Sequence, residues 1–176
     1  MTGQGLTGIH SSNGAFFKFL SGSGLPYVAQ LTLAAVGSSF WVNTTGVSPN
    51  SNGLLEEING STGVVERTLH GDARAIDNPT SMAVFGSKEW NVGSAEESVG
   101  PPRIVETNLQ TGAEITLASH GDKAWSVAIA GGKLWAYAWC GVHPVNCLSE
   151  YSLQTGAFEG RVILGGTEPV ALTPEA

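Results

Sequence analysis

Two copies of a short His-Gly-Asp motif hold the side chains of this sequence that are best suited to chemistry. His70 and Asp72 form the first copy, and His120 and Asp122 form the second. Two imidazoles and two carboxylates that converge would suit a divalent metal ion or acid–base work. A structural role fits the same residues, because an Asp after Gly caps a turn through backbone N–H groups while the His stays exposed. The sequence leaves both interpretations open.

Three further residues are candidate ligand contacts because of where they stand in the sequence. His143 lies in a predicted loop, and Trp125 and Trp139 fall outside the repeat described below, near predicted loops. Loops and the aromatic residues beside them are common sites of binding. Cys140 and Cys147 bracket the loop that contains His143. The base of a hairpin loop is narrow enough for a disulfide in an oxidising compartment, and two reduced thiols fit the sequence equally well.

Composition and charge exclude several classes of partner. The 176 residues include 15 acidic and 8 basic side chains, so the net charge is −7, which disfavours nucleic acid and anionic membrane surfaces. No apolar run approaches the length of a membrane span, and no secretion signal is recognisable at the start. Extracellular and cytoplasmic locations both remain open. Apolar residues make up 41%, which is enough for a sizeable packed core.

Two markers repeat along the chain with nearly the same period. The first marker ends in a turn glycine, and its copies are GIHSSNG (8–14), EINGSTG (57–63), ETNLQTG (106–112) and EYSLQTG (150–156). The second marker contains a tryptophan, and Trp41, Trp90 and Trp135 are spaced 49 and 45 residues apart. We predict that these Trp residues pack between sheets. The Glu residues that open the last three turn markers (Glu57, Glu106, Glu150) are predicted to form a hydrogen bond or an ion pair within each unit.

Each repeat unit predicts four short antiparallel strands. In the best-defined copy these strands are 80–85, 88–93, 103–108 and 113–118, and glycine-containing turns separate several of them. No stretch shows a capped helical period, so helix should be scarce. Four strands at a period of 44 to 49 residues indicate the blades of a β-propeller. A β-sandwich is the alternative, but it does not predict a Trp in phase with the repeat.

The repeats resemble a known family. NPTSMAVFGSKEW and LLEEINGSTGVVERTL are similar to the YVTN and NHL-type repeats of the streptogramin-lyase-like propeller superfamily. The resemblance covers nearly the whole chain and implies an all-β propeller. It says little about activity, because such repeats serve scaffolds, sensors and enzymes alike.

The units do not add up to a whole number of blades. Within a single domain, 1–176, we expect about four blades: complete repeats at about 25–72, 79–120 and 124–165, with partial ones at 5–20 and 168–173. This total is one strand short of four blades. Three outcomes stay open: an imperfect four-bladed ring, a ring shared by two chains, or a fragment of a longer propeller. Open terminal blades favour self-association.

The longer predicted connections gather on one face of the expected propeller. These connections are 44–52, 70–78, 93–102, 120–124 and 140–146. We therefore predict a non-catalytic binding or scaffold module that uses this face for an unidentified protein or small-molecule ligand. The alternative is a metal-assisted lyase or hydrolase of the streptogramin-lyase type, for which a divalent ion such as magnesium would be the cofactor. In either case the candidate ligand-binding residues are those named above.

Overall fold

A computed structural model describes the backbone in nine stretches of the chain. These stretches are residues 5–9, 16–21, 28–46, 54–70, 79–93, 103–118, 120, 122–140 and 145–164. Side chains are described from residue 32 onward within these stretches, except for residues 44–46, 70 and 79. The expected partial blade at 168–173 lies outside the described residues, and so do most of the predicted loops. No helix in the described part is long and apolar enough to cross a bilayer.

The described chain forms three four-stranded antiparallel sheets and one hairpin. The first sheet contains β3 (Val28–Val36), β4 (Ser39–Gly46), β5 (Leu54–Asn59) and β6 (Val65–His70). The middle sheet contains β7 (Pro79–Phe85), β8 (Lys88–Gly93), β9 (Arg103–Asn108) and β10 (Glu114–Thr116). The last sheet contains β11 (Lys123–Ala130), β12 (Lys133–Cys140), β13 (Val145–Ser152) and β14 (Phe158–Ile163). The N-terminal hairpin pairs β1 (Gly5–Ile9) with β2 (Phe16–Ser21).

Strand order confirms the predicted meander in every unit. Within each sheet the strands follow one another in chain order, so each pairs with its sequence neighbour. The predicted strand at 113–118 is longer than the observed β10. Leu117 ends the strand early because its side chain turns into the core between two sheets, while its N–H donates to the backbone oxygen of Ile104 at 2.9 Å.

The turn between the third and fourth strands is built the same way in each sheet. Gly63, Gly112 and Gly156 have φ values of 64°, 74° and 69°, the left-handed region that glycine enters without steric cost. In the middle sheet, Asn108 Oδ1 accepts from the backbone N–H groups of Gln110 and Thr111 at 2.9 and 3.0 Å. The turn marker recognised in the sequence is therefore a capped turn with a glycine at its end.

The repeat Glu lies directly opposite the repeat Trp in all three sheets. The paired residues are Trp41 with Glu57, Trp90 with Glu106, and Trp135 with Glu150. The predicted ion pair within each unit is confirmed, since each of these carboxylates meets a cation of its own sheet. The pairs are Glu57 with Arg67 at 3.0 Å, Glu106 with Lys88 at 2.7 Å, and Glu150 with Lys133 at 3.2 Å.

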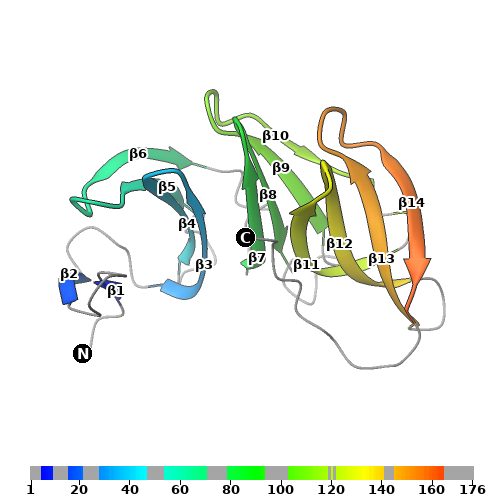
Figure 1. The fold of residues 1–176 in the computed structure, drawn as a ribbon, viewed down its shortest axis with the longest axis horizontal. Coiled ribbons are helices and arrows are strands. Elements are labelled where there is room, and N and C mark those ends of the chain that lie inside the picture. Colours follow the sequence, from blue (N-terminus) through cyan, green and yellow to red (C-terminus); the bar gives the residue numbers. More distant parts are fainter. Residues whose placement is uncertain are drawn as a thin grey trace.

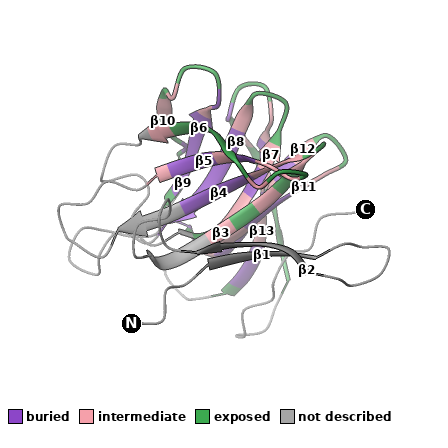
Figure 2. Cartoon of the chain, turned by 90° about the vertical axis from the view of Figure 1, so that its left-hand side faces the viewer, coloured by how far each residue is buried: buried purple, intermediate pink, exposed green. Residues whose placement is uncertain are grey.

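The core lies between the sheets (Figure 2). One apolar cluster joins the first sheet to the middle sheet through Trp41, Leu55 and Leu109. A larger cluster joins the middle sheet to the last sheet and includes Trp90, Leu117 and many residues of β11 to β13. Trp41 and Trp90 are 3% and 0% exposed, which confirms that they pack between sheets. Burial on both faces of the middle sheet follows from this face-to-face stacking.

The sheets stand side by side in an open arc (Figure 1). β3, β7 and β11, the first strands of the three sheets, lie toward the inside of the arc, and β6, β10 and β14 lie away from it. The N-terminal hairpin lies beside the first sheet, at the end of the arc opposite to β14.

Candidate functional site

A groove runs along the inside of the arc, where the first strands of the three sheets face one another. Its volume is about 490 Å³. It is lined by Thr32 to Ala35 of β3, Thr80 to Val84 of β7, and Val127 to Ile129 of β11. None of these lining residues carries an ionisable side chain. The groove therefore offers apolar surface and hydroxyl groups, and its described walls hold no acid, base or charged metal ligand.

Two hydroxyl side chains in the groove wall hold the middle and last sheets together. Thr80 Oγ1 donates to the backbone oxygen of Trp125 at 3.0 Å, and Val127 N–H donates to Ser81 Oγ at 3.1 Å. Ser81 Oγ also lies 3.2 Å from Ser126 Oγ. These hydroxyls position the first strands and make the groove wall continuous across two sheets.

A third hydroxyl in the wall is differently placed. Thr32 Oγ1 is buried and has no hydrogen-bond partner in the protein. A buried hydroxyl without a partner is costly, so a water or ligand atom that bonds it would be stabilised. Thr32 Oγ1 is thus a hydroxyl of the described wall that has no hydrogen bond within the protein.

Trp125 and Trp139 pack against each other in the last sheet. Their rings meet edge to face with centroids 5.2 Å apart, and both residues are half-buried. Trp125 occupies an irregular position of β11, between the paired residues Ala124 and Ser126. Its Nε1 is buried and has no hydrogen-bond partner. Thr80, which lines the groove, bonds the backbone of Trp125, but neither indole is among the residues that line the groove.

Asp122 is held inside the last sheet by two side chains. The carboxylate is 2% exposed, accepts from Ser149 Oγ at 2.7 Å, and pairs with Arg161 Nη1 at 3.1 Å. The turn-capping role stays a prediction, because Ser119 and Gly121 of this loop lie outside the described residues. Burial of the carboxylate is possible because a cation and a hydroxyl compensate its charge.

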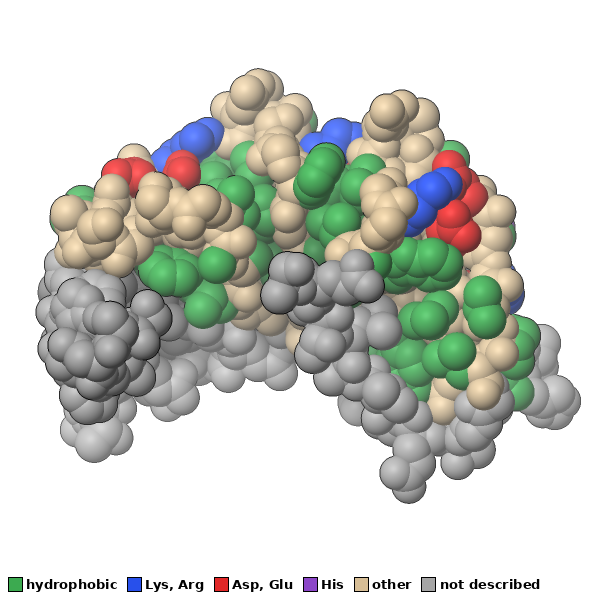
Figure 3. Space-filling model, in the orientation of Figure 1, with side chains coloured by type: hydrophobic (Ala, Val, Ile, Leu, Met, Phe, Trp, Pro, Cys, Tyr) green, Lys and Arg blue, Asp and Glu red, His purple; other side chains and the backbone are tan. Residues whose placement is uncertain are grey.

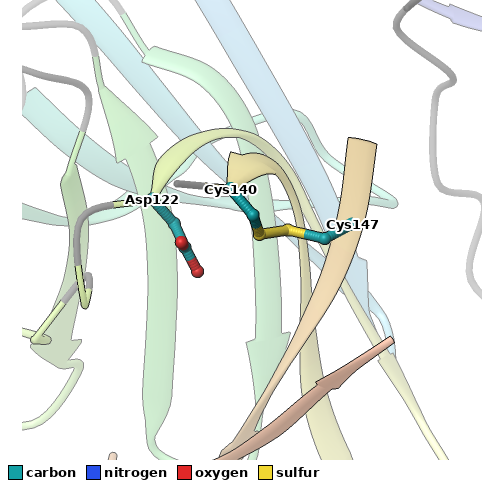
Figure 4. Close-up of side chains that lie close together, drawn as sticks. All are labelled: Asp122, Cys140 and Cys147. Atoms are coloured by element: carbon teal, nitrogen blue, oxygen red, sulfur yellow. A yellow bond between two sulfur atoms is a disulfide. The ribbon is translucent and has the colours of Figure 1, made fainter. Parts of the chain in front are cut away.

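A disulfide lies beside Asp122 (Figure 4). Cys140 at the end of β12 is bonded to Cys147 of β13, with Cα atoms 6.1 Å apart, so the structure favours the oxidised alternative. The two sulfur atoms and an Asp122 oxygen lie within 4.8 Å of one another, and all three residues are buried. Both sulfurs are consumed by the disulfide and the carboxylate by Arg161, so this cluster does not offer a metal site in the oxidised chain.

The remaining candidates are only partly described. His120 is exposed, has a φ of 48°, and lies with its ring centroid 4.5 Å from that of Phe158. His70 ends β6, and its side chain lies outside the described residues, as do Asp72 and His143. Whether the two His-Gly-Asp motifs converge therefore stays a prediction.

Two functional-looking groups were missed by the sequence analysis. Arg161 is one of them, because nothing in the sequence indicates that β14 brings it to Asp122. The other is Glu89, which is 1% exposed and lies on the opposite face of β8 from Trp90. Burial raises the pKa of Glu89 to about 8, and the nearby charge of Glu114 adds to the effect. The strict alternation of K-E-W-N in this strand could have indicated an inward Glu89.

Comparison with solved structures identifies the fold of the described chain. The chain superposes on the dihydro-heme d1 dehydrogenase NirN, solved in complex with DHE, with a TM-score of 0.53 and 15% sequence identity. The match covers 89% of this chain and 32% of that chain. The fold is that of a β-propeller. The three sheets are its blades, and the groove lies where the inner strands of a propeller face its axis.

The likeness extends to the fold only. A europium-containing methanol dehydrogenase matches with a TM-score of 0.49 and 12% identity, over 81% of this chain and 27% of that chain. The chain thus spans about a third of the length of these structures or less. No family model matches the chain, and no curated protein sequence matches it. The narrower resemblance to YVTN and NHL-type repeats therefore stays a prediction.

Proposed function

We propose that this chain is a non-catalytic propeller module that binds a ligand in the groove between β3, β7 and β11. The observation that carries this proposal is the chemistry of the groove wall, which combines apolar side chains with hydroxyl groups and contains no ionisable residue among the described ones. Acid–base and metal-assisted reactions need such groups at the reacting atoms. A binding site needs only a shaped apolar wall with a few placed polar groups.

The groove suits an uncharged guest that has one hydrogen-bond acceptor. Leu33, Met82 and Val84 supply apolar wall, and the unpaired hydroxyl of Thr32 supplies a donor. An anionic guest is disfavoured by the net charge of −7. We therefore expect a neutral small molecule or a neutral peptide segment rather than nucleic acid.

A metal-assisted lyase or hydrolase is the weaker alternative. It would require Asp122 to exchange its bonds to Arg161 and Ser149 for a divalent ion such as magnesium. No described contact favours that exchange. If the alternative holds, Asp122→Asn should abolish magnesium binding in isothermal titration of the purified chain.

The groove is tested with a neutral apolar fluorophore such as Nile red. Leu33→Asp places a charge in the groove, and Val64→Asp makes the same change on the turn before β6 as a control. Leu33 and Val64 are 47% and 54% exposed, so the fold should tolerate both changes. We expect Leu33→Asp to weaken fluorophore binding at least about tenfold, because a charge resists transfer into an apolar site. Equal affinities of the two variants would overturn the proposal.

A further inference from the structure

A buried cluster of four polar side chains lies in the last sheet, apart from the groove. Its members are Asp122, Cys140, Cys147 and Ser149, which are at most 2% exposed, and none of them lines the groove. Asp122 directly precedes β11, Cys140 ends β12, and Cys147 and Ser149 belong to β13. Figure 4 shows the Asp122 carboxylate beside the two sulfur atoms. Sulfur and carboxylate atoms gathered in this way are the donor set of a transition-metal site once the sulfurs are thiolates.

The distances in this cluster are close to those of a tetrahedral zinc site. The two sulfurs and an Asp122 oxygen all lie within 4.8 Å of one another. Ser149 Oγ lies 4.0 Å from Cys140 Sγ, 3.8 Å from Cys147 Sγ and 2.7 Å from Asp122 Oδ2. Zinc bonds of about 2.3 Å to sulfur and about 2.1 Å to oxygen place the corners of a tetrahedron about 3.4–3.8 Å apart. The corners are therefore nearly in place, once the bond between the sulfurs is broken and the hydrogen bond from Ser149 to Asp122 lengthens.

Arg161 gives the cluster the charge that a buried zinc site needs. Its Nη1 lies 3.1 Å from Asp122 Oδ1, which is buried and accepts no hydrogen bond, so this oxygen keeps room for a further partner. Two thiolates and a carboxylate carry three negative charges, which a zinc ion and the guanidinium together neutralise. A buried set of charges is tolerated when it is compensated in this way. A group that bonds a ligating carboxylate also fixes its orientation.

The blade fold does not itself need this polar set. Ser149 and Arg161 lie opposite each other in the last sheet, and their counterparts in the middle sheet, Val105 and Thr116, lie opposite each other in the same way. Val105 is 1% exposed, so an apolar side chain fills the position that corresponds to Ser149. The last sheet therefore has a hydroxyl and a cation where the middle sheet packs without them.

We propose that the reduced chain binds a single zinc ion through Cys140, Cys147 and Asp122, and that formation of the disulfide releases it. Thiolates are soft ligands, which bind zinc in preference to magnesium or calcium. Ser149 stands at the fourth corner, where its hydroxyl or a water that it bonds completes the tetrahedron. The oxidised chain has no thiolate to offer.

Binding and release are balanced reactions. A dithiol reduces the disulfide with two electrons and two protons and is itself oxidised to a disulfide, and zinc then replaces the two thiol protons. For release, a small-molecule disulfide accepts two electrons from the two zinc-bound thiolates and becomes two thiolates. The bond between Cys140 and Cys147 forms again and the zinc ion leaves. Zinc occupancy thus follows the thiol–disulfide balance of the surroundings.

Isothermal titration with zinc compares the oxidised chain with a chain reduced by a phosphine and kept free of oxygen. We expect one ion per reduced chain, and binding at least about a hundredfold weaker to the oxidised chain, because disulfide sulfurs are not thiolate ligands. Cobalt in place of zinc should give near-ultraviolet thiolate charge-transfer absorption in the reduced chain only. Equal binding by the two states, or no such absorption, would overturn the proposal.

Circular dichroism covers the case in which the reduced chain unfolds without metal. Zinc should then restore the β-sheet spectrum, since binding to the folded site supplies free energy of folding. A reduced chain that stays unfolded in zinc would overturn the proposal. Magnesium should have no effect in either state.

The competing zinc ligands in this chain are exposed carboxylates and imidazoles. Figure 3 shows acidic side chains in small groups near the turns of the arc. The double variant Cys140→Ser with Cys147→Ser keeps all of them, so its titration measures what they bind. We expect this variant to lose the tight site, and an unchanged affinity would count against the cluster.

Asp122 is tested against a matched carboxylate. Asp122→Asn should weaken zinc binding by the reduced chain at least about tenfold, because it removes an anionic ligand. Glu106→Gln is the control, since Glu106 is also buried, at 6% exposure, and pairs with Lys88 at 2.7 Å in the middle sheet. This control should bind zinc as the unchanged chain does. Equal losses in the two variants would overturn the three-ligand site.

Discussion

Glu89 is a carboxyl group buried between the first and middle sheets, although its sequence neighbours Lys88 and Trp90 face the last sheet. The alternation of side chains along β8 places it on the same face as Val84, which packs against the first sheet. Its pKa of about 8 follows mainly from the loss of hydration on burial. The folded chain therefore keeps a proton that the unfolded chain releases near pH 4.5.

This proton makes stability depend on pH. Since the pKa of Glu89 is raised on folding, its contribution to the free energy of unfolding is largest at low pH and falls as pH rises from about 4.5 to 8. The slope is at most about 1.4 kcal/mol per pH unit. We expect Glu89→Gln to flatten this slope in urea titrations at pH 5, 6.5 and 8. Glu66→Gln, at an exposed residue, is the control, and an unchanged slope in Glu89→Gln would contradict the assignment.

Asp122 is a second buried carboxyl group, and unlike Glu89 it has a cation beside it. It is 2% exposed, as deeply placed as Glu89, but Arg161 and Ser149 compensate its charge. An acidic residue that lies next to a turn in the sequence thus forms a buried ion pair in the structure. This is why we do not assign it to catalysis.

At the scale of the element, the turn between the third and fourth strands carries the next prediction. Gly112 has a φ of 74°, and an added Cβ would meet only Leu69 Cδ2 at an ordinary 3.7 Å. Gly112→Val should therefore destabilise the chain by about 1–2 kcal/mol through left-handed backbone strain alone. Thermal or urea unfolding measures the loss.

Substitutions at two other glycines test whether backbone strain causes the loss of stability. At Gly156 the added Cβ would also come within 2.6 Å of Leu117 Cδ2, so the same change there should cost more than at Gly112. Gly160 lies in β14 with no left-handed φ and no atom near the added Cβ, so Gly160→Ala should cost little or nothing. Equal losses at Gly112 and Gly160 would show that backbone strain is not the cause.

At the scale of the whole molecule, packing between blades holds the arc together. Leu117 leaves β10 and inserts between the middle and last sheets, where it is 5% exposed. Leu117→Ala should lower the free energy of unfolding by about 2–4 kcal/mol, because it removes buried contacts and leaves a cavity. Ile115→Ala, on the same short strand but 52% exposed, should change it by less than about 0.5 kcal/mol.

The number of unfolding transitions in Leu117→Ala tests whether neighbouring blades unfold together. Because one apolar cluster spans the middle and last sheets, we expect a single shifted transition for these two blades when circular dichroism and Trp fluorescence are compared. Separate transitions in Leu117→Ala would show that the blades fold as independent units.

The sequence by itself determined the repeat, and with it much of the fold. The turn glycines, the strand ranges 80–85, 88–93 and 103–108, and the ion pairs of Glu57, Glu106 and Glu150 were predicted and are observed. They were predictable because a strand alternates with a period of two and a tight turn needs glycine at one position. These are local properties, and they recur in each unit.

The tertiary structure decided everything that depends on packing between units. The groove joins strands that are about one repeat apart in sequence, and the partner of Asp122 comes from β14. Identical repeat residues also differ in exposure, since Trp90 is fully buried and Trp135 is not. Local spacing assigns all three Trp residues the same role, but the burial of each ring depends on what packs against it in three dimensions.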